Sequence, residues 1–154
     1  HQCPSGALSY RRTDGGPAEQ APEVNTARIR ENGPYAFRGA LRLKGADIGF
    51  RAVLCRCGQS KNKPFCDNSH IEAGFRATGE PDSIESAPLE VRNGVVELEP
   101  LYNGPLMVTG NLEIVTGTGH TVRRITRTQL CRCGGSRTKP FCDGTHNKIG
   151  FKAP

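Results

Sequence analysis

The sequence predicts a small, mostly-β (α+β) fold in which two similar halves pack against each other. Three observations predict it: few large apolar residues, many turn residues, and a pattern of cysteine and histidine that occurs twice. The 154 residues include no Trp and one Met, and only 35% are hydrophobic, so each half alone is too small to bury a stable core. The 19 Gly and 11 Pro indicate short strands and turns rather than long helices.

One unit is repeated along the chain. An offset of 76 residues relates two sets of candidate ligands, which are Cys55, Cys57, Cys66 and His70 in the first copy and Cys131, Cys133, Cys142 and His146 in the second. Upstream, the Asn-Gly-Pro at 32–34 recurs at 103–105 with an offset of only 71. The second copy therefore has five extra residues before its first cysteine, and we expect a longer hairpin loop near residues 117–120 to hold them.

Each copy is expected to contain three strands. Alternating apolar and charged residues, with an Asn-Gly turn after the first strand, predict strands at 27–31, 35–43 and 49–54, and at 95–99, 106–115 and 122–130. After the third cysteine, Asp67 or Asp143 can cap the start of a short helix. That helix would hold His70 or His146 in its first turn.

The domain organisation follows from the repeat. We expect a polar arm at 1–25, a first unit at 26–77, a linker at 78–89 and a second unit at 90–154. Neither arm nor linker suggests chemistry. No apolar run approaches the roughly 20 residues that cross a bilayer, and residues 1–10 lack the order of a signal peptide.

The candidate ligands have the spacing C-x-C-x8-C-x3-H in both copies, in the segments CRCGQSKNKPFCDNSH and CRCGGSRTKPFCDGTH. Two cysteines separated by one residue can reach one metal region, a Gly- and Ser-containing loop returns the third, and the helix start directs the histidine to the same place. Finding this spacing twice makes chance a poor explanation.

Three other interpretations compete. Three cysteines and a histidine form an ordinary structural zinc site, but such sites separate their paired cysteines by two to four residues. A catalytic Cys-His pair would leave two thiols per copy unexplained. A disulfide framework does not need histidine, and the seven cysteines are odd in number. The one-residue separation favours a metal centre other than zinc.

Both 16-residue segments resemble the signature of the CDGSH iron-sulfur family, also called NEET proteins. The resemblance implies two 2Fe-2S clusters. In each copy the first two cysteines would bind one iron, and the third cysteine and the histidine the other. It also implies a β-cap joined to a cluster-binding loop and short helix, with the two units imitating the usual homodimer within a monomer. Asn68 departs from the Gly of the motif, which puts the local helix geometry in question.

Charge explains why a histidine ligand matters. Two ferric irons, two sulfides and three thiolates sum to one negative charge, and neutral imidazole adds none. Replacing a thiolate by imidazole therefore raises the reduction potential, by the logic of His-ligated Rieske centres. Asn68 against Gly144 and Gln59 against Gly135 predict unequal surroundings for the two clusters.

The net charge of +6 suits an acidic partner. Cations in the ligand loops could offset the anionic clusters or steer such a partner, or form a solvated surface: Arg56, Lys61, Lys63, Arg132, Arg137 and Lys139. We expect electron transfer, cluster transfer or redox sensing with a redox partner or apo-acceptor protein, and no enzyme activity or membrane. The alternative is a zinc-stabilised module for nucleic acid, against which aromatic residues, at 6%, offer no stacking platform. The resemblance and the thiolate ligands imply a cytoplasmic, bacterial protein.

Cys3 stands apart from the repeat. Its Cys-Pro sequence resembles the end of a divergent ferredoxin-type module found beside CDGSH motifs in some bacterial proteins, which implies a longer parent chain. An isolated thiol is the alternative.

Overall fold

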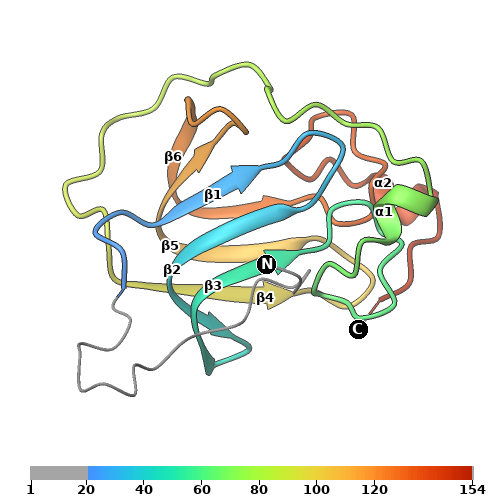
Figure 1. The fold of residues 1–154 in the computed structure, drawn as a ribbon, viewed down its shortest axis with the longest axis horizontal. Helices are drawn as coiled ribbons and strands as arrows, with labels where there is room; N and C mark the ends of the chain where they lie inside the picture. Colours follow the sequence, from blue (N-terminus) through green and yellow to red (C-terminus); the bar gives the residue numbers. More distant parts are fainter. Residues whose placement is uncertain (1–20, 154) are drawn as a thin grey trace, which may run out of the picture.

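The computed structural model describes residues 21–153 (Figure 1). The arm expected at 1–25 is therefore described only from residue 21 onward, and Cys3 lies outside the described residues. No helix within the described residues is both long and apolar enough to cross a membrane.

The described residues form six strands and two single-turn helices. In chain order these are β1 (Thr26–Ile29), β2 (Tyr35–Leu43), β3 (Ala46–Leu54), α1 (Ser69–Glu72), β4 (Val95–Pro100), β5 (Leu106–Val115), β6 (Thr121–Leu130) and α2 (Thr145–Lys148). The mostly-β class predicted from the sequence is confirmed, with the two units in tandem.

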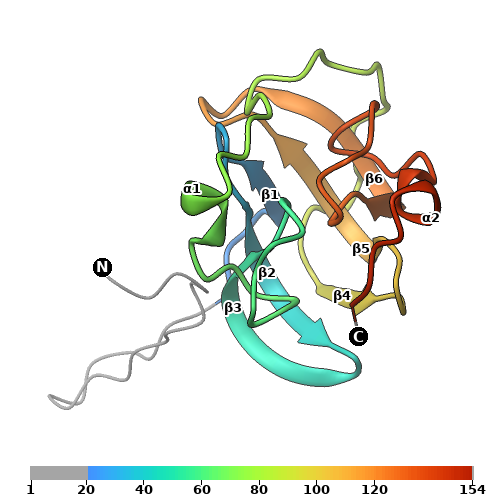
Figure 2. The ribbon, with the colours of Figure 1, turned by 90° about the vertical axis from the view of Figure 1, so that its right-hand side faces the viewer.

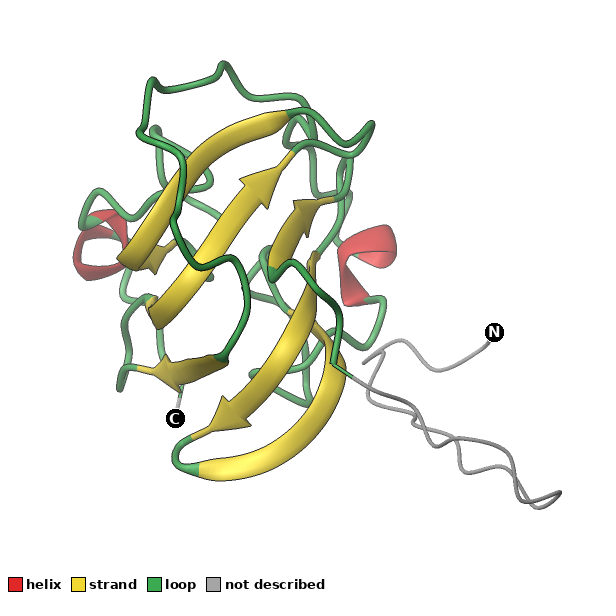
Figure 3. Ribbon diagram, turned by 90° about the vertical axis from the view of Figure 1, so that its left-hand side faces the viewer, coloured by secondary structure: helices red, strands yellow, loops and turns green. Residues whose placement is uncertain are grey.

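Four of the strands form a closed ring. β1 pairs antiparallel with β2, β2 pairs parallel with β4, β4 pairs antiparallel with β5, and β5 pairs parallel with β1. β3 extends the ring beside β2, and β6 extends it beside β5, both antiparallel. The result is a small mixed barrel that continues into two hairpins (Figure 3).

The strand pairings repeat with the two copies exchanged. The first strand of each copy pairs antiparallel with the second strand of its own copy and parallel with the second strand of the other copy. At two places in the ring, therefore, a strand of one copy pairs with a strand of the other copy. Neither half closes its part of the barrel alone.

A single apolar core fills the barrel. Side chains alternate along β2, where Tyr35, Phe37 and Leu41 are buried while Arg38 and Arg42 are exposed. The core cluster draws on all six strands and therefore on both copies. Burial of these side chains is the main stabilising contribution available to so small a fold.

The hairpin of the first copy begins earlier than predicted. Lys44 and Gly45 both have positive φ (50° and 83°) and form a two-residue turn, so β3 begins at Ala46. The expectation of a strand start at Gly49 was wrong, because this glycine lies inside β3 next to a shift in register. Of the five extra residues in the second copy, three lie in the β5–β6 loop, as expected, and one in each flanking strand.

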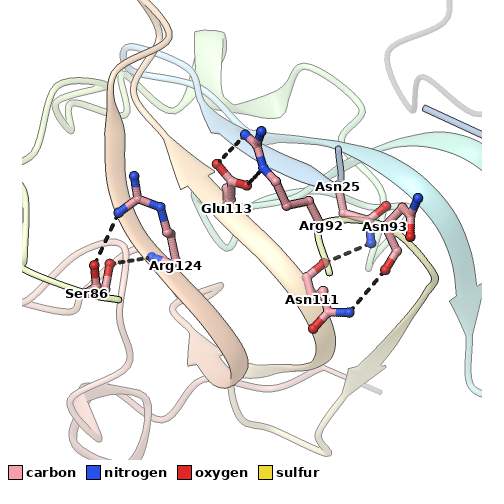
Figure 4. Close-up of polar contacts among 7 residues, drawn as sticks. All are labelled: Asn25, Ser86, Arg92, Asn93, Asn111, Glu113 and Arg124. Carbon is pink, nitrogen blue, oxygen red and sulfur yellow. Dashed lines mark hydrogen bonds and ion pairs between the residues drawn. The ribbon is translucent and has the colours of Figure 1, made fainter. Parts of the chain in front are cut away.

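The connection between the copies, residues 73–94, contains no helix or strand but is held against the second copy (Figure 4). Ser86 accepts hydrogen bonds from the Arg124 backbone N–H and guanidinium, at 2.9 and 3.2 Å. Arg92 forms a bidentate ion pair with buried Glu113, at 2.5 and 3.0 Å. The connection therefore packs along β5 and β6.

Because the core is shared, a cavity in either copy should destabilise the whole domain. Leu41→Ala and Leu112→Ala, at equivalent buried positions, should each lower the free energy of unfolding by about 2–5 kcal/mol in one cooperative transition. Chemical denaturation followed by circular dichroism measures this. Val95→Ala, at a residue 55% exposed, is the control and should change it by less than about 0.5 kcal/mol. Two separate transitions would contradict the shared core.

Candidate metal centre

The candidate ligands of both copies lie at one end of the barrel, where β3 and β6 end (Figure 2). Cys55 directly follows β3 and Cys131 directly follows β6. Each ligand loop then folds back on the strand that precedes it, through the bridges Leu54↔Phe65 and Leu130↔Phe141. The helices α1 and α2, which carry the histidines, lie on opposite sides of the two loops (Figure 2).

The four candidate ligands of each copy are arranged as two pairs. In the first copy the sulfurs of Cys55 and Cys57 are 3.8 Å apart, and the Cys66 sulfur is 3.7 Å from His70 Nδ1. The corresponding distances in the second copy are 3.7 and 3.6 Å. Metal bonds of about 2.3 Å to sulfur and 2.0–2.1 Å to nitrogen give tetrahedral edges of about 3.8 and 3.6 Å. Each pair thus fits two corners of a tetrahedron around one metal.

No three His, Cys, Asp or Glu side chains among residues 21–153 converge on one ion position. A small hollow lies between the two pairs in each copy. The same ten positions line it in both copies, among them the Gly-Pro of the Asn-Gly-Pro turn and all four candidate ligands.

Within each cysteine pair the two thiols differ. The hydrogen bond from Cys57 lowers the pKa of Cys55 despite burial, and the backbone N–H groups of Ser60 and Gly58 lower it further. The same hydrogen bond, together with burial, raises the pKa of Cys57. The second copy repeats this, with the pKa of Cys131 lowered and that of Cys133 raised. A metal ion that binds the pair would release the remaining proton.

The other two ligands receive support from the backbone. The Asn68 N–H lies 3.4 Å from the Cys66 sulfur and the Gly144 N–H 3.4 Å from that of Cys142, distances that suit N–H···S hydrogen bonds. Burial, and after it the charge of Arg56, lowers the pKa of His70. The neutral imidazole, which is the form that binds metals, is therefore favoured there.

The start of each helix differs from the prediction. Asn68 and Gly144 occupy the N-cap positions, both in the left-handed region, at φ of 69° and 86°, and neither makes a side-chain cap bond. The preceding aspartate accepts the N–H at the first helical position, Ser69 or Thr145, and a second N–H from the ligand loop. Asn tolerates the left-handed conformation, so Asn68 preserves the geometry that Gly144 has.

The two ligand loops touch back to back. A Cβ at Gly58 would lie 2.5 Å from the Cys133 carbonyl oxygen, and one at Gly134 would lie 2.5 Å from that of Cys57. Both glycines have positive φ, 82° and 83°. The backbones of the two ligand loops are thus in direct contact.

The arginine between the paired cysteines is not a surface cation. Arg56 and Arg132 are buried, at 1% and 2% exposure, and point away from solvent. Arg56 donates to the carbonyls of Gly33 and Arg30 in the turn after β1, and Arg132 donates to the equivalent turn after β4. Of the three roles considered for these two arginines, steering a partner and forming a solvated surface do not fit their burial. They attach the ligand segment to the turn between the first two strands of each copy.

Two short motifs that occur in both copies, Gly-Phe and Asn-Gly-Pro, take part in the contacts around these arginines. Phe75 and Phe151 follow a glycine that ends each helix, and their rings lie 5.2 and 5.4 Å from the guanidinium carbons of Arg56 and Arg132. The Asn of each Asn-Gly-Pro turn pairs with the chain beyond that phenylalanine, as Asn32 does with Ala77 at 2.8 and 3.0 Å. The occurrence of both motifs in each copy was the signal in the sequence that could have indicated these contacts.

Sequence reasoning missed Tyr35. Its hydroxyl, from β2 of the first copy, donates to the Cys131 carbonyl at 2.5 Å and lies 3.1 Å from that of Pro140, both in the second ligand loop. Leu106 occupies the equivalent position of the second copy and has no hydroxyl. Burial is the main reason that the pKa of Tyr35 is raised, so the phenol keeps its proton for donation.

Comparisons with known proteins agree with this geometry. A family model described as an iron-binding zinc finger of the CDGSH type matches residues 32–71 and 103–147, more than half of the chain. CDGSH iron-sulfur domain-containing protein 1 of Rattus norvegicus is 33% identical over 67 residues, which cover 44% of this chain and 58% of that protein. The protein of the same name from Mus musculus is 58% identical over 26 residues, 17% of this chain and 24% of that protein. The match thus spans less than two thirds of either relative.

Because the two ligand loops are in contact, a substitution in one loop should affect both candidate sites. Gly58→Ala forces a Cβ against the Cys133 backbone, so we expect iron retention to fall at both sites rather than one. The iron-to-protein ratio and the decay of visible absorbance measure this.

Gly45→Ala is the matched control, because Gly45 has nearly the same φ, 83°, but no heavy atom within 4 Å of the added Cβ. The Gly45→Ala variant should lower the free energy of unfolding by about 1 kcal/mol, because alanine disfavours this positive φ, and it should leave iron retention unchanged. Equal iron loss in the two variants would show that the loop contact is unimportant.

Proposed function

This chain belongs to the CDGSH-type iron-binding family, and we propose that it binds two 2Fe-2S clusters and carries electrons or donates clusters. The observation that supports this best is the arrangement of the candidate ligands as two pairs in each copy. A single zinc ion needs four donors around one point, whereas a 2Fe-2S cluster needs two donors on each of two irons. The paired donors fit the second arrangement.

In this proposal Cys55 and Cys57 hold one iron of the first cluster, and Cys66 and His70 hold the other. Residues 131, 133, 142 and 146 do the same for the second cluster. A bound 2Fe-2S cluster would supply a one-electron redox centre. The thiolates supply negative charge, the N–H donors to sulfur offset part of it, and the neutral imidazole adds none.

The position of the ligands suits exchange with a partner. The cysteines of the first copy are at least 92% buried, while His70 and His146 are partly exposed at the rim. The histidine side therefore faces the solvent and is the side where electrons or a cluster would leave. The family consists of cluster-binding proteins that are generally not enzymes, and we propose that this chain has no enzyme activity of its own. Its partners would be a redox protein or an apo-acceptor.

The exchanged strands support a monomer with an internal two-fold relation. The two copies contact each other through the parallel β1–β5 and β2–β4 pairings and through the loop contact at Gly58 and Gly134. We propose that the two units replace the two subunits of a dimer. No second chain is then needed to complete either site.

The proposal predicts about four irons and four acid-labile sulfides per chain, with visible absorption, in protein prepared anaerobically. His70→Cys and His146→Cys should each lower the reduction potential of one cluster, because a thiolate adds negative charge where imidazole adds none. Redox titration followed by visible absorption measures this.

His120→Cys is the control, since His120 lies in the β5–β6 loop away from both sites and should leave both potentials unchanged. A colourless protein that contains only zinc would exclude the proposal and favour the zinc-stabilised alternative.

A further inference from the structure

A large groove lies beside the first candidate site and is lined by residues of β1, β2 and β3. These three strands are neighbours in the sheet (Figure 1). Its volume is about 940 Å³, and the residues that matter most on its wall are Arg28, Arg30, Arg38, Arg51, Cys66 and His70. Arg28, Arg30 and Arg38 are exposed and Arg51 is partly exposed. The groove thus runs from a basic strand surface to the ligands that we assign to the outer iron.

The strand register concentrates positive charge in the groove. Arg38 of β2 lies directly opposite Arg51 of β3, and Thr26 of β1 lies opposite Arg38 on its other side. Arg28 shares this face and donates to the neutral Gly117 carbonyl at 2.9 Å, which leaves its charge in place. The positive charge of this face suits an anionic ligand.

Three of the four arginines are found in the first copy alone. The residues equivalent to Arg28, Arg30, Arg38 and Arg51 in the second copy are Glu99, Leu101, Thr109 and Arg127. Thr109 lies opposite Arg127 in the same register as Arg38 opposite Arg51. The fold therefore accepts uncharged or acidic residues at the positions of Arg28, Arg30 and Arg38, so these three arginines are not needed to form the barrel.

The groove reaches the first candidate site, because Cys66 and His70 line it together with Arg30. A negative group bound in the groove would therefore lie beside the His70 side of that site. Glu31, also on the groove wall, accepts the Gly79 N–H at 2.6 Å, and Glu23 is the other carboxylate there.

We propose that this groove docks an acidic polypeptide segment of the protein that exchanges electrons or a cluster with the first site. The inference rests on the function proposed above. Arginines spread over three strands suit carboxylates spaced along a chain, each of which an arginine can bind with two hydrogen bonds. Positive charge along a groove also speeds the approach of an acidic partner.

Nucleic acid fits the groove less well. The one aromatic residue on its described wall, Phe37, is 1% exposed and offers no face for base stacking. Glu23 and Glu31 would also repel a continuous phosphate backbone, while separate carboxylates can avoid them.

The test uses the iron-loaded protein and a fluorescein-labelled octaglutamate peptide, with binding followed by fluorescence anisotropy at low and high salt. The double variant Arg30→Leu/Arg38→Thr installs the residues of the second copy and should weaken binding about five- to tenfold. Arg127→Thr removes an exposed arginine at the equivalent place in the second copy and should change affinity less than about twofold. The wild-type affinity should fall with salt.

A second variant works in the opposite direction. Glu99→Arg/Thr109→Arg gives the second copy the charge of the first and should strengthen octaglutamate binding, which keeps the proposal testable if the first variant folds poorly. Iron content and both reduction potentials, measured on each variant, show separately whether the proposed clusters form. Equal weakening by Arg127→Thr, or no weakening by the Arg30/Arg38 variant, would overturn the proposal. Tighter binding of an octathymidine strand than of octaglutamate would also overturn it.

Discussion

The exchange of strands between the two copies is the constraint on which the rest of the molecule depends. β1 lies between β2 and β5, and β4 lies between β5 and β2, so each copy is completed by the other. A unit of this size cannot bury enough apolar surface alone, and the ring gives both units one core. The same exchange brings the ends of β3 and β6 to one end of the barrel. The barrel therefore sets where both ligand loops begin.

Two sets of contacts to the backbone connect the barrel to the candidate sites. The guanidinium groups of Arg56 and Arg132 each bind carbonyls of the turn between the first two strands, which fixes the ligand segment to the barrel. The close approach of Gly58 and Gly134 to the opposite loop then fixes the two ligand segments to each other. Such buried, charge-assisted hydrogen bonds are costly to break, because the partner groups would lose them without gaining water. The two ligand segments are consequently attached both to the barrel and to each other.

The sequence was sufficient for what depends on local pattern. Alternating residues predicted five of the six strands closely, and the spacing of cysteine and histidine predicted which side chains would meet. Local sequence pattern was not sufficient where long-range packing determines the position of a residue. The strand expected from Gly49 begins at Ala46 instead, and the register shift at Gly49 lies within β3. Arg56 was expected to offset cluster charge, to steer a partner or to lie on a solvated surface, and the turn carbonyls that bind it explain why it is buried. The parallel pairings between copies have no local signal at all.

The two copies are most alike in the residues that line the two candidate sites, and they differ outside those residues. The ten positions around each site coincide, and even Asn68 adopts the conformation of Gly144. Outside that shell the copies diverge: Tyr35 donates to the second ligand loop from a position that holds Leu106 in the other copy. The donated hydrogen bond withdraws electron density from the Cys131 backbone, and hydrogen bonding around a metal site is one of the means by which proteins tune reduction potential. An internal repeat can therefore keep two sites equal in ligation and unequal in surroundings, a freedom that a symmetric homodimer does not have.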